Sequence, residues 1–197
     1  MRLGRAILVV GAASVLLAAC VGVASAGRLS TSANTVNAVW TRLIFSGGIG
    51  NVECEVIVNG TFHERTISKI RGSLTGLITA ANISRCARGG GSVLRETLPW
   101  HVRYDSFQGT LPNISLIRAL VVGLAFRIRE PTFGIECLSR ATAEEPGAIT
   151  FNLDGSRQVA TANASGTIRC TSFNGTLSGT SSTIGEAAGA RVTVTLI

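Results

Sequence analysis

Several features that define common enzyme and binding classes are scarce or missing in this sequence. The 197 residues include one lysine, one tyrosine and two histidines, and aromatic residues make up 5% of the chain. No Gly-x-Ser-x-Gly pattern is present, which removes the nucleophile elbow of serine hydrolases. No Cys-x-x-Cys spacing is present either, so the cysteines do not indicate a zinc site. The sequence therefore indicates no cofactor and no catalytic motif.

The first 26 residues have the order of a secretory leader. Arg2 and Arg5 precede an apolar run over residues 6–19, and Ala24-Ser25-Ala26 forms a small-x-small cleavage site. Residues 1–26 are therefore predicted to be a signal peptide and residues 27–197 a single secreted domain. The segment Leu17-Ala18-Ala19-Cys20 also fits a bacterial lipobox, so the alternative is a protein lipid-anchored through Cys20 to the outer face of the cell membrane.

The net charge and the distribution of basic residues limit the classes of partner. Without Arg2 and Arg5, the chain has 16 basic residues against 11 acidic ones, a net charge of +5. The basic residues are scattered singly with few aromatics between them, which argues against nucleic acid as a partner. No transmembrane segment is expected after removal of the leader. An acidic envelope polymer or a small apolar ligand remains as a partner class, and neither is identified.

Four cysteines remain in the predicted mature chain, an even number in an oxidising compartment. They are Cys54, Cys86, Cys137 and Cys170, which allow three pairings. We favour Cys54–Cys86 and Cys137–Cys170, because these pairs close loops of similar length and segments close in sequence are commonly close in space.

Hydrophobic alternation predicts an all-β fold. Residues 35–45, 52–58, 74–86 and 114–129 alternate at period two, and residues 191–197 form a clean alternating strand at the C-terminus. Residues 66–71 are predicted to be a helical turn or a bend, and the triple glycine after Arg88 is predicted to join residues 74–86 to the central stretch as a hairpin. We therefore expect one antiparallel β-sandwich or barrel of about nine to ten short strands with two disulfides.

The richest stretch in aromatic and ionisable residues is residues 97–111. Alternation places one set of side chains on an apolar face and the other set on a polar face, where the charges are expected to be solvated. Two interpretations follow: a core strand with aromatic anchors, or a functional site. With His63 of a neighbouring segment, the candidate patch comprises Trp100, His101, Arg103, Tyr104, Asp105 and His63.

Four segments carry a resemblance to known proteins: LPWHVRY (98–104), SFQGTLPNI (106–114), GTFHERTI (60–67) and RVTVTLI (191–197). Together they resemble uncharacterised secreted β-rich proteins of high-GC Gram-positive bacteria, across most of the predicted mature chain. The resemblance implies secretion and a β-rich fold, and it implies no activity.

Two function classes follow from these observations. The first is a non-catalytic secreted or cell-envelope β-domain that binds a hydrophobic ligand, a glycan or a protein. The alternative is a secreted enzyme of unknown type that uses His101 with nearby acidic residues. An enzyme is expected to place His63 or His101 with an acid in a concave pocket, whereas a binding domain is expected to show an apolar cavity without them.

Overall fold

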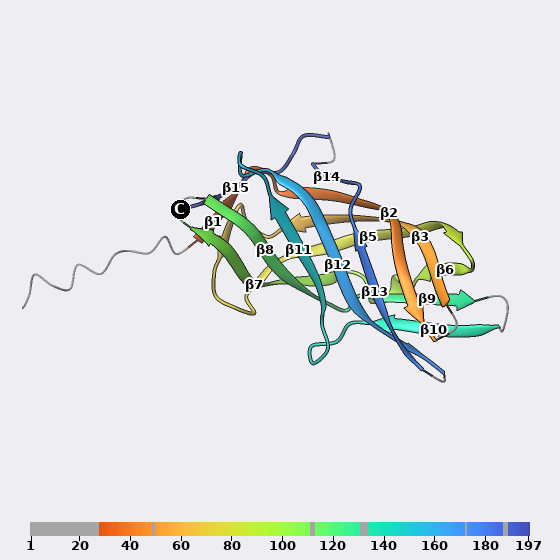
Figure 1. The fold of residues 1–197 in the computed structure, drawn as a ribbon. Helices are drawn as coiled ribbons and strands as arrows, with labels where there is room; N and C mark the ends of the chain where they lie inside the picture. Colours follow the sequence, from red (N-terminus) through yellow and green to blue (C-terminus); the bar gives the residue numbers. More distant parts are fainter. Residues whose placement is uncertain (1–27, 49, 111–112, 131–133, 172, 187–188) are drawn as a thin grey trace, which may run out of the picture.

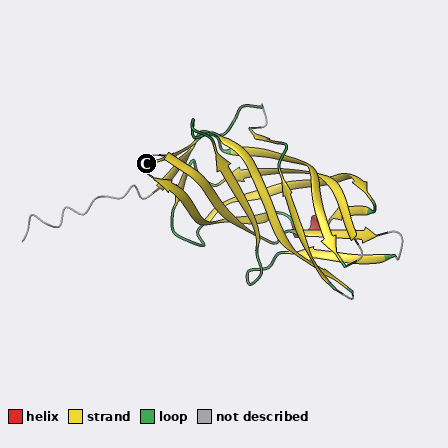
Figure 2. Ribbon diagram, in the orientation of Figure 1, coloured by secondary structure: helices red, strands yellow, loops and turns green. Residues whose placement is uncertain are grey.

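The computed structural model describes residues 28–48, 50–110, 113–130, 134–171, 173–186 and 189–197. It is all-β apart from one 3-10 turn, Arg95–Thr97 (Figure 2). The described strands form an antiparallel sheet of twelve strands and a second sheet of three. The strands are β1 (Arg28–Thr31), β2 (Thr35–Gly47), β3 (Gly50–Phe62), β4 (Thr66–Ser68), β5 (Leu74–Ala87), β6 (Gly90–Val93), β7 (Trp100–Thr110), β8 (Asn113–Val122), β9 (Ala125–Glu130), β10 (Ile135–Arg140), β11 (Gly147–Leu153), β12 (Val159–Cys170), β13 (Asn174–Thr180), β14 (Thr183–Gly185) and β15 (Val194–Leu196).

The predicted strand count of nine to ten was wrong for two reasons: a turn inside an apolar run was not recognised, and short strands were not predicted. The apolar run over residues 114–129 is two strands, since Gly123 between them has a φ of +91° and turns the chain. Residues 66–71 are not a helical turn, because their first half is the short strand β4; the predicted bend is present after it, at Ile70. The triple glycine leads from β5 into β6. As predicted, β5 pairs antiparallel with the central stretch, β7, over Leu74–Ile78, but β6 and the 3-10 turn lie between the two strands in sequence.

Eight strands of the large sheet close into a cylinder, called the closed sheet below. Their order around it is β2, β3, β5, β7, β8, β11, β12 and β13, and β13 pairs back with β2. The pairing of β11 with both β8 and β12 completes the ring, so the described pairings correspond to the barrel and not to the sandwich (Figure 1). Side chains alternate between the inside and outside of such a ring, which accounts for the period of two in the sequence.

One end of the closed sheet is covered by the three-stranded sheet, called the cap sheet below. It consists of β15, β1 and β4, and Figure 1 shows it beside the ends of β7 and β8. Leu29 of β1 is fully buried and Val194 of β15 is 4% exposed. The C-terminal strand thus docks against the body of the protein, as its apolar alternation predicted.

The other end is covered by β6, β9 and β10, which extend the sheet from the last residues of β12. Phe126 of β9 packs edge-on against Trp100 of β7 and Phe45 of β2, with ring centroids 5.4 and 5.6 Å apart. These three rings are buried and close the interior at this end. Most of the buried hydrophobic residues of the described chain belong to one core cluster, which includes Leu29 of the cap sheet and Phe126 near the opposite end.

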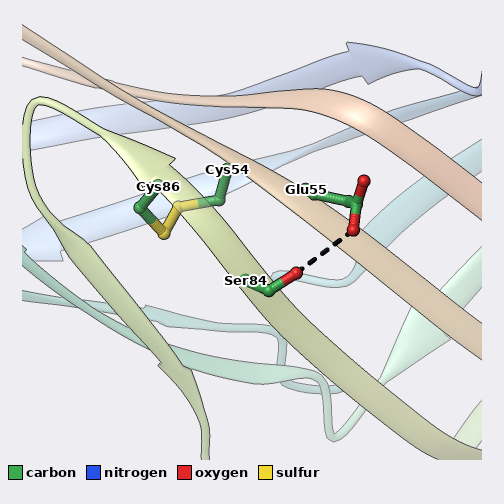
Figure 3. The surroundings of a disulfide bond; sticks show 4 residues. All are labelled: Cys54, Glu55, Ser84 and Cys86. Carbon is green, nitrogen blue, oxygen red and sulfur yellow. Dashed lines mark hydrogen bonds between the residues drawn. A yellow bond between two sulfur atoms is a disulfide. The ribbon is translucent and has the colours of Figure 1, made fainter.

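Both predicted disulfides are present. Cys54 of β3 is bonded to Cys86 of β5, and Cys137 of β10 is bonded to Cys170 of β12. Figure 3 shows the first bond beside a hydrogen bond of 3.2 Å from the Ser84 hydroxyl to the Glu55 carboxylate. Each disulfide links two strands that are already paired, and such bonds are compatible with an extracellular location.

The predicted signal peptide and the predicted lipidation site at Cys20 lie outside the described residues. Within the described residues, no helix has the length and apolar character needed to cross a membrane.

Candidate functional site

The predicted patch is divided between the two faces of β7. Trp100 is fully buried and Tyr104 is 5% exposed, and both side chains line the interior of the closed sheet. His101 is exposed and Arg103 is half-buried on the outer face. The predicted alternation is therefore confirmed from Trp100 to Tyr104, and the six predicted residues do not form one continuous site.

Asp105 departs from the expectation of solvated charges, because it is buried although it belongs to the outer face. The pairing of β7 with β8 shifts at this residue: Tyr104 lies opposite Ala119 and Ser106 lies opposite Arg118, which leaves Asp105 as a bulge. The Nε of Arg71 lies 2.7 Å from Oδ1 of Asp105, and the Nε of Arg118 lies 3.6 Å from Oδ2. Period-two alternation in the sequence predicts neither this bulge nor the contact of the carboxylate with two arginines.

The two histidines lie on the same part of the sheet, and both are exposed. His101 lies opposite Leu77 of β5, and Leu77 lies opposite Thr61 of β3, two residues before His63. About 10 Å therefore separates the strands that carry them, given the usual spacing between strands. Both side chains are exposed, and neither lines the two interior chambers described next.

The interior of the closed sheet contains a cavity of about 80 Å³ next to the cap sheet, called the cap chamber. Leu29, Ile67 and Val194 of the cap sheet form its end. Its wall is almost entirely apolar and includes Val36, Ala38, Trp40, Val58, Ile78, Val102, Tyr104, Ile117, Ala119, Ile149 and Phe151. The chamber thus occupies the axis of the molecule, between the eight paired strands and the cap.

A second cavity of about 40 Å³, called the inner chamber, continues along the same axis. It shares Trp40, Val58, Ile78 and Ile149 with the cap chamber. Trp100 and Phe126 line its far part, where the aromatic rings close the interior. The two chambers together are called the lumen below.

The inner chamber is lined in part by the charged residues Arg140 and Glu145, whereas the buried polar groups along the lumen are bonded within the protein. The indole nitrogen of Trp40 donates to the carbonyl oxygen of Ala162 at 3.1 Å, and that of Trp100 donates to the hydroxyl of Thr97 at 2.8 Å. The hydroxyl of Thr75 donates to the carbonyl oxygen of Val102 at 2.9 Å. In the described part of the chain, no buried side-chain nitrogen or oxygen atom lacks a partner. An apolar guest would therefore displace no hydrogen bond of these groups, and a polar guest would find few free ones.

Among the described residues in the wall of the cap chamber, Tyr104 is the one with an ionisable side chain. Burial raises the pKa of its phenol above the ordinary value of 10.0, and the negative charge of Asp105 raises it further. The phenol is therefore neutral across the physiological pH range, and the lumen carries no charge from this residue.

The size of the lumen limits what it can hold. An apolar cavity of about 150 Å³ stays dry and takes up a molecule of the size of benzene, whereas sites for drug-sized ligands measure roughly 300 to 1,000 Å³. The cap chamber, at about 80 Å³, is below both values. Without movement of the wall, the lumen therefore suits a slender apolar group.

The lumen could not be identified from the sequence. Its wall residues belong to eight strands that are distant in sequence, and alternation assigns them only to a core. The cavity exists because the sheet closes into a ring. This closure depends on the pairing of β11 with β12, which alternation in the sequence does not reveal.

Among the described residues, no group of three or more histidine, cysteine, aspartate or glutamate side chains is placed to hold a metal ion. Comparison with known proteins gave no match to a family model, to a curated protein or to a solved structure.

Proposed function

We propose that this protein is a non-catalytic binding domain that holds a slender apolar ligand, such as an alkyl chain, in its lumen. The observation that carries the proposal is the cap chamber, an apolar cavity of about 80 Å³ on the axis of the closed sheet. An eight-stranded cylinder is just wide enough for its side chains to fill it or for one small ligand to be held. Here the side chains leave space along the axis.

Two physical arguments support an apolar ligand over a glycan. Transfer of apolar surface from water into the lumen is favourable by about 25 cal/mol per Å² of surface buried. A sugar in the cap chamber would leave its hydroxyl groups without partners, because the wall there is almost entirely apolar and its buried side-chain polar groups are already paired, at a cost of about 1 to 3 kcal/mol for each group. The lumen is therefore matched to an aliphatic ligand.

The cellular setting is part of the same proposal. The leader of residues 1–26, the two disulfides and the resemblance to secreted β-rich proteins of high-GC Gram-positive bacteria support a protein released from the cell or held at its outer face. In that setting, alkyl chains of lipids are an abundant apolar ligand.

The alternative of an enzyme that uses His101 gains no support from the site geometry. His101 and His63 are exposed on the outer face, and the lumen wall lacks both. The binding domain is thus the function that the geometry supports best.

Native mass spectrometry of the protein, purified without detergent or organic solvent from the host that secretes it, tests the proposal. We expect a bound apolar molecule of defined mass, which is released when the same sample is denatured. The denatured mass also distinguishes cleavage after Ala26 from lipidation at Cys20. A ligand-free protein that also takes up no alkyl alcohol or fatty acid when these are added would contradict the proposal.

A further inference from the structure

The loop between β4 and β5 presents apolar and basic side chains to solvent. Ile70 is 72% exposed and Leu74 is 47% exposed, and these are two of the three large hydrophobic residues most exposed in the described structure. The third, Ile197 at 55%, is the C-terminal residue. Apolar side chains of this size at nearby loop positions mark an interaction surface more often than isolated ones do.

Four basic residues surround these two side chains. Lys69 and Arg71 flank Ile70 in sequence, and Arg103 lies directly opposite Leu74 on the neighbouring strand. Arg118 joins them through Asp105, which both it and Arg71 contact. The ammonium group of Lys69 lies 5.3 Å from the centre of the Phe107 ring of β7, which ties this end of the loop to β7. Lys69, Ile70, Arg71, Leu74, Arg103 and Arg118 are called the docking surface below.

The docking surface is strongly cationic to an approaching partner. The side chain of Asp105 is 5% exposed, whereas the side chains of Arg71 and Arg118 are 80% and 49% exposed. The negative charge therefore lies beneath the positive ones and offsets only part of them. A positive surface with exposed aliphatic side chains at its centre complements a negatively charged surface with an apolar layer behind it.

We propose that the docking surface binds the surface of a membrane that contains anionic phospholipids. The lipid phosphates attract the basic side chains, and Ile70 and Leu74 enter the boundary between headgroups and acyl chains. An acidic polysaccharide or another soluble polyanion would use the charges but would gain little from the two aliphatic residues. The exposure of both residues therefore favours the membrane.

This inference rests on the proposed function, because the docking surface is connected to the cap chamber. Lys69 follows β4 directly, and β4 contributes Ile67 to the end of the chamber. Backbone bonds from Gly72 to Tyr104 and from Tyr104 to Ser73 fix the loop on β7, whose Tyr104 lines the same chamber. Docking would thus place the capped end of the lumen at the membrane, which is the source of alkyl chains.

Cosedimentation with vesicles tests the proposal on the chain as it is secreted. One set of vesicles contains equal amounts of phosphatidylglycerol and phosphatidylcholine, and the other contains phosphatidylcholine alone. The apolar variant is I70S with L74S, and its matched control is I197S, which removes another exposed isoleucine elsewhere. The charge variant is K69A with R103A, and its matched control is R95A with R127A, two exposed arginines near the opposite end. Arg71 and Arg118 are left in place because they contact the buried Asp105.

We expect binding to the anionic vesicles that is at least tenfold stronger than binding to the neutral ones and that weakens with added salt. The charge variant should bind about thirtyfold more weakly, and the apolar variant about tenfold more weakly, with both controls unchanged. Equal binding to both vesicles, or unchanged binding of the apolar variant, would overturn the proposal. The proposal would also be overturned if dextran sulfate bound the protein as tightly as the anionic vesicles do and if its affinity were unchanged in the I70S/L74S variant.

Failure of this inference and failure of the proposed function are distinguishable. Uptake of hexanol by each variant in the absence of vesicles measures the lumen alone, and none of the four substituted loop and strand residues lines it. If the substituted variants take up hexanol like the parent protein but bind vesicles more weakly, both proposals are supported. If the parent protein binds anionic vesicles but takes up no hexanol, only the proposal of a ligand site in the lumen is contradicted.

Discussion

The indole nitrogen of Trp40 on β2 donates a hydrogen bond of 3.1 Å to the carbonyl oxygen of Ala162 on β12. The same carbonyl accepts the backbone N–H of Ser181 at 2.8 Å, and the Ser181 hydroxyl accepts the backbone N–H of Ala162, also at 2.8 Å. Trp40 is 2% exposed and lines both chambers. Its ring is therefore held by the wall of the lumen and is placed to report on anything that occupies it.

Substitution of Trp40 by phenylalanine should lower the free energy of unfolding by about 1 to 3 kcal/mol, from loss of the hydrogen bond and of packed surface. The Ala162 carbonyl keeps its bond to Ser181, so it is not left without a partner. Urea unfolding followed by circular dichroism measures the change. The fluorescence response to an apolar ligand should fall in W40F more than in W100F, because Trp100 lines only the inner chamber. A full response in W40F would contradict the assignment.

The phenol of Tyr104 should ionise above its ordinary pKa of 10.0 in the folded protein, because burial and the charge of Asp105 both oppose the phenolate. Tyr104 is the only tyrosine, so the ultraviolet absorbance of the phenolate reports on this residue alone. The folded protein retains this proton above pH 10 while the unfolded chain loses it. The contribution to stability is therefore complete below pH 10 and is lost as the pH rises through the folded value.

The control for this titration is the same protein in guanidinium chloride, where the midpoint should return to about 10. The variant Y104F should lose the part of the alkaline decline in stability that belongs to the phenol. Coincident titration curves for the folded and unfolded protein would contradict the buried position of the ring.

Replacement of Asp105 by asparagine should lower the free energy of unfolding by about 1 to 3 kcal/mol, because two arginines lose a charged acceptor that is buried beneath them. The matched control is Glu145→Gln, which breaks the exposed ion pair with Arg169 at 2.6 Å. Exposed pairs of this kind contribute little to stability because water and salt screen them, so E145Q should differ little from the parent. Chemical denaturation of both variants checks the difference, and equal losses would refute it.

Removal of either disulfide should destabilise the protein by roughly 3 to 4 kcal/mol, because a crosslink lowers the conformational entropy of the unfolded chain. The two bonds span 32 and 33 residues, so this entropic effect is nearly equal for C54A with C86A and for C137A with C170A. A much larger loss in one pair would show that its packing in the folded state dominates. Guanidinium titrations of the two double variants provide the comparison.

The sequence was sufficient for the fold class because each strand carries its own local signal. Alternation in residues 52–58 and 191–197 identified strands and their buried faces, and loop lengths favoured the disulfide pairing that is present. The shortest strands were not predicted, because three residues, as in β4, are too few to show a period of two. Their existence depends on partners far away in the chain, such as the pairing of β4 with β1.

The sites depended still more on distant contacts. The burial of Asp105 results from a bulge in β7 and from Arg71 and Arg118, which lie 34 and 13 positions away. The lumen exists because strands from both ends of the chain pair into a ring. Alternation identified Trp100 and Tyr104 as inward-facing residues, but it could not show that the space beside them is incompletely filled.

Two alanine-to-leucine substitutions, compared by ligand binding and by stability, test whether the lumen is a ligand site. Ala38→Leu adds three carbon atoms inside the cap chamber, whereas Ala80→Leu adds the same atoms on the exposed face of β5. Binding of hexanol, followed by tryptophan fluorescence, should weaken at least tenfold in A38L and remain unchanged in A80L. Because the added atoms fill existing space, A38L should unfold at the same or a higher denaturant concentration than the parent protein. Unchanged affinity in A38L, or an equal loss of affinity in A80L, would contradict a ligand site within the lumen.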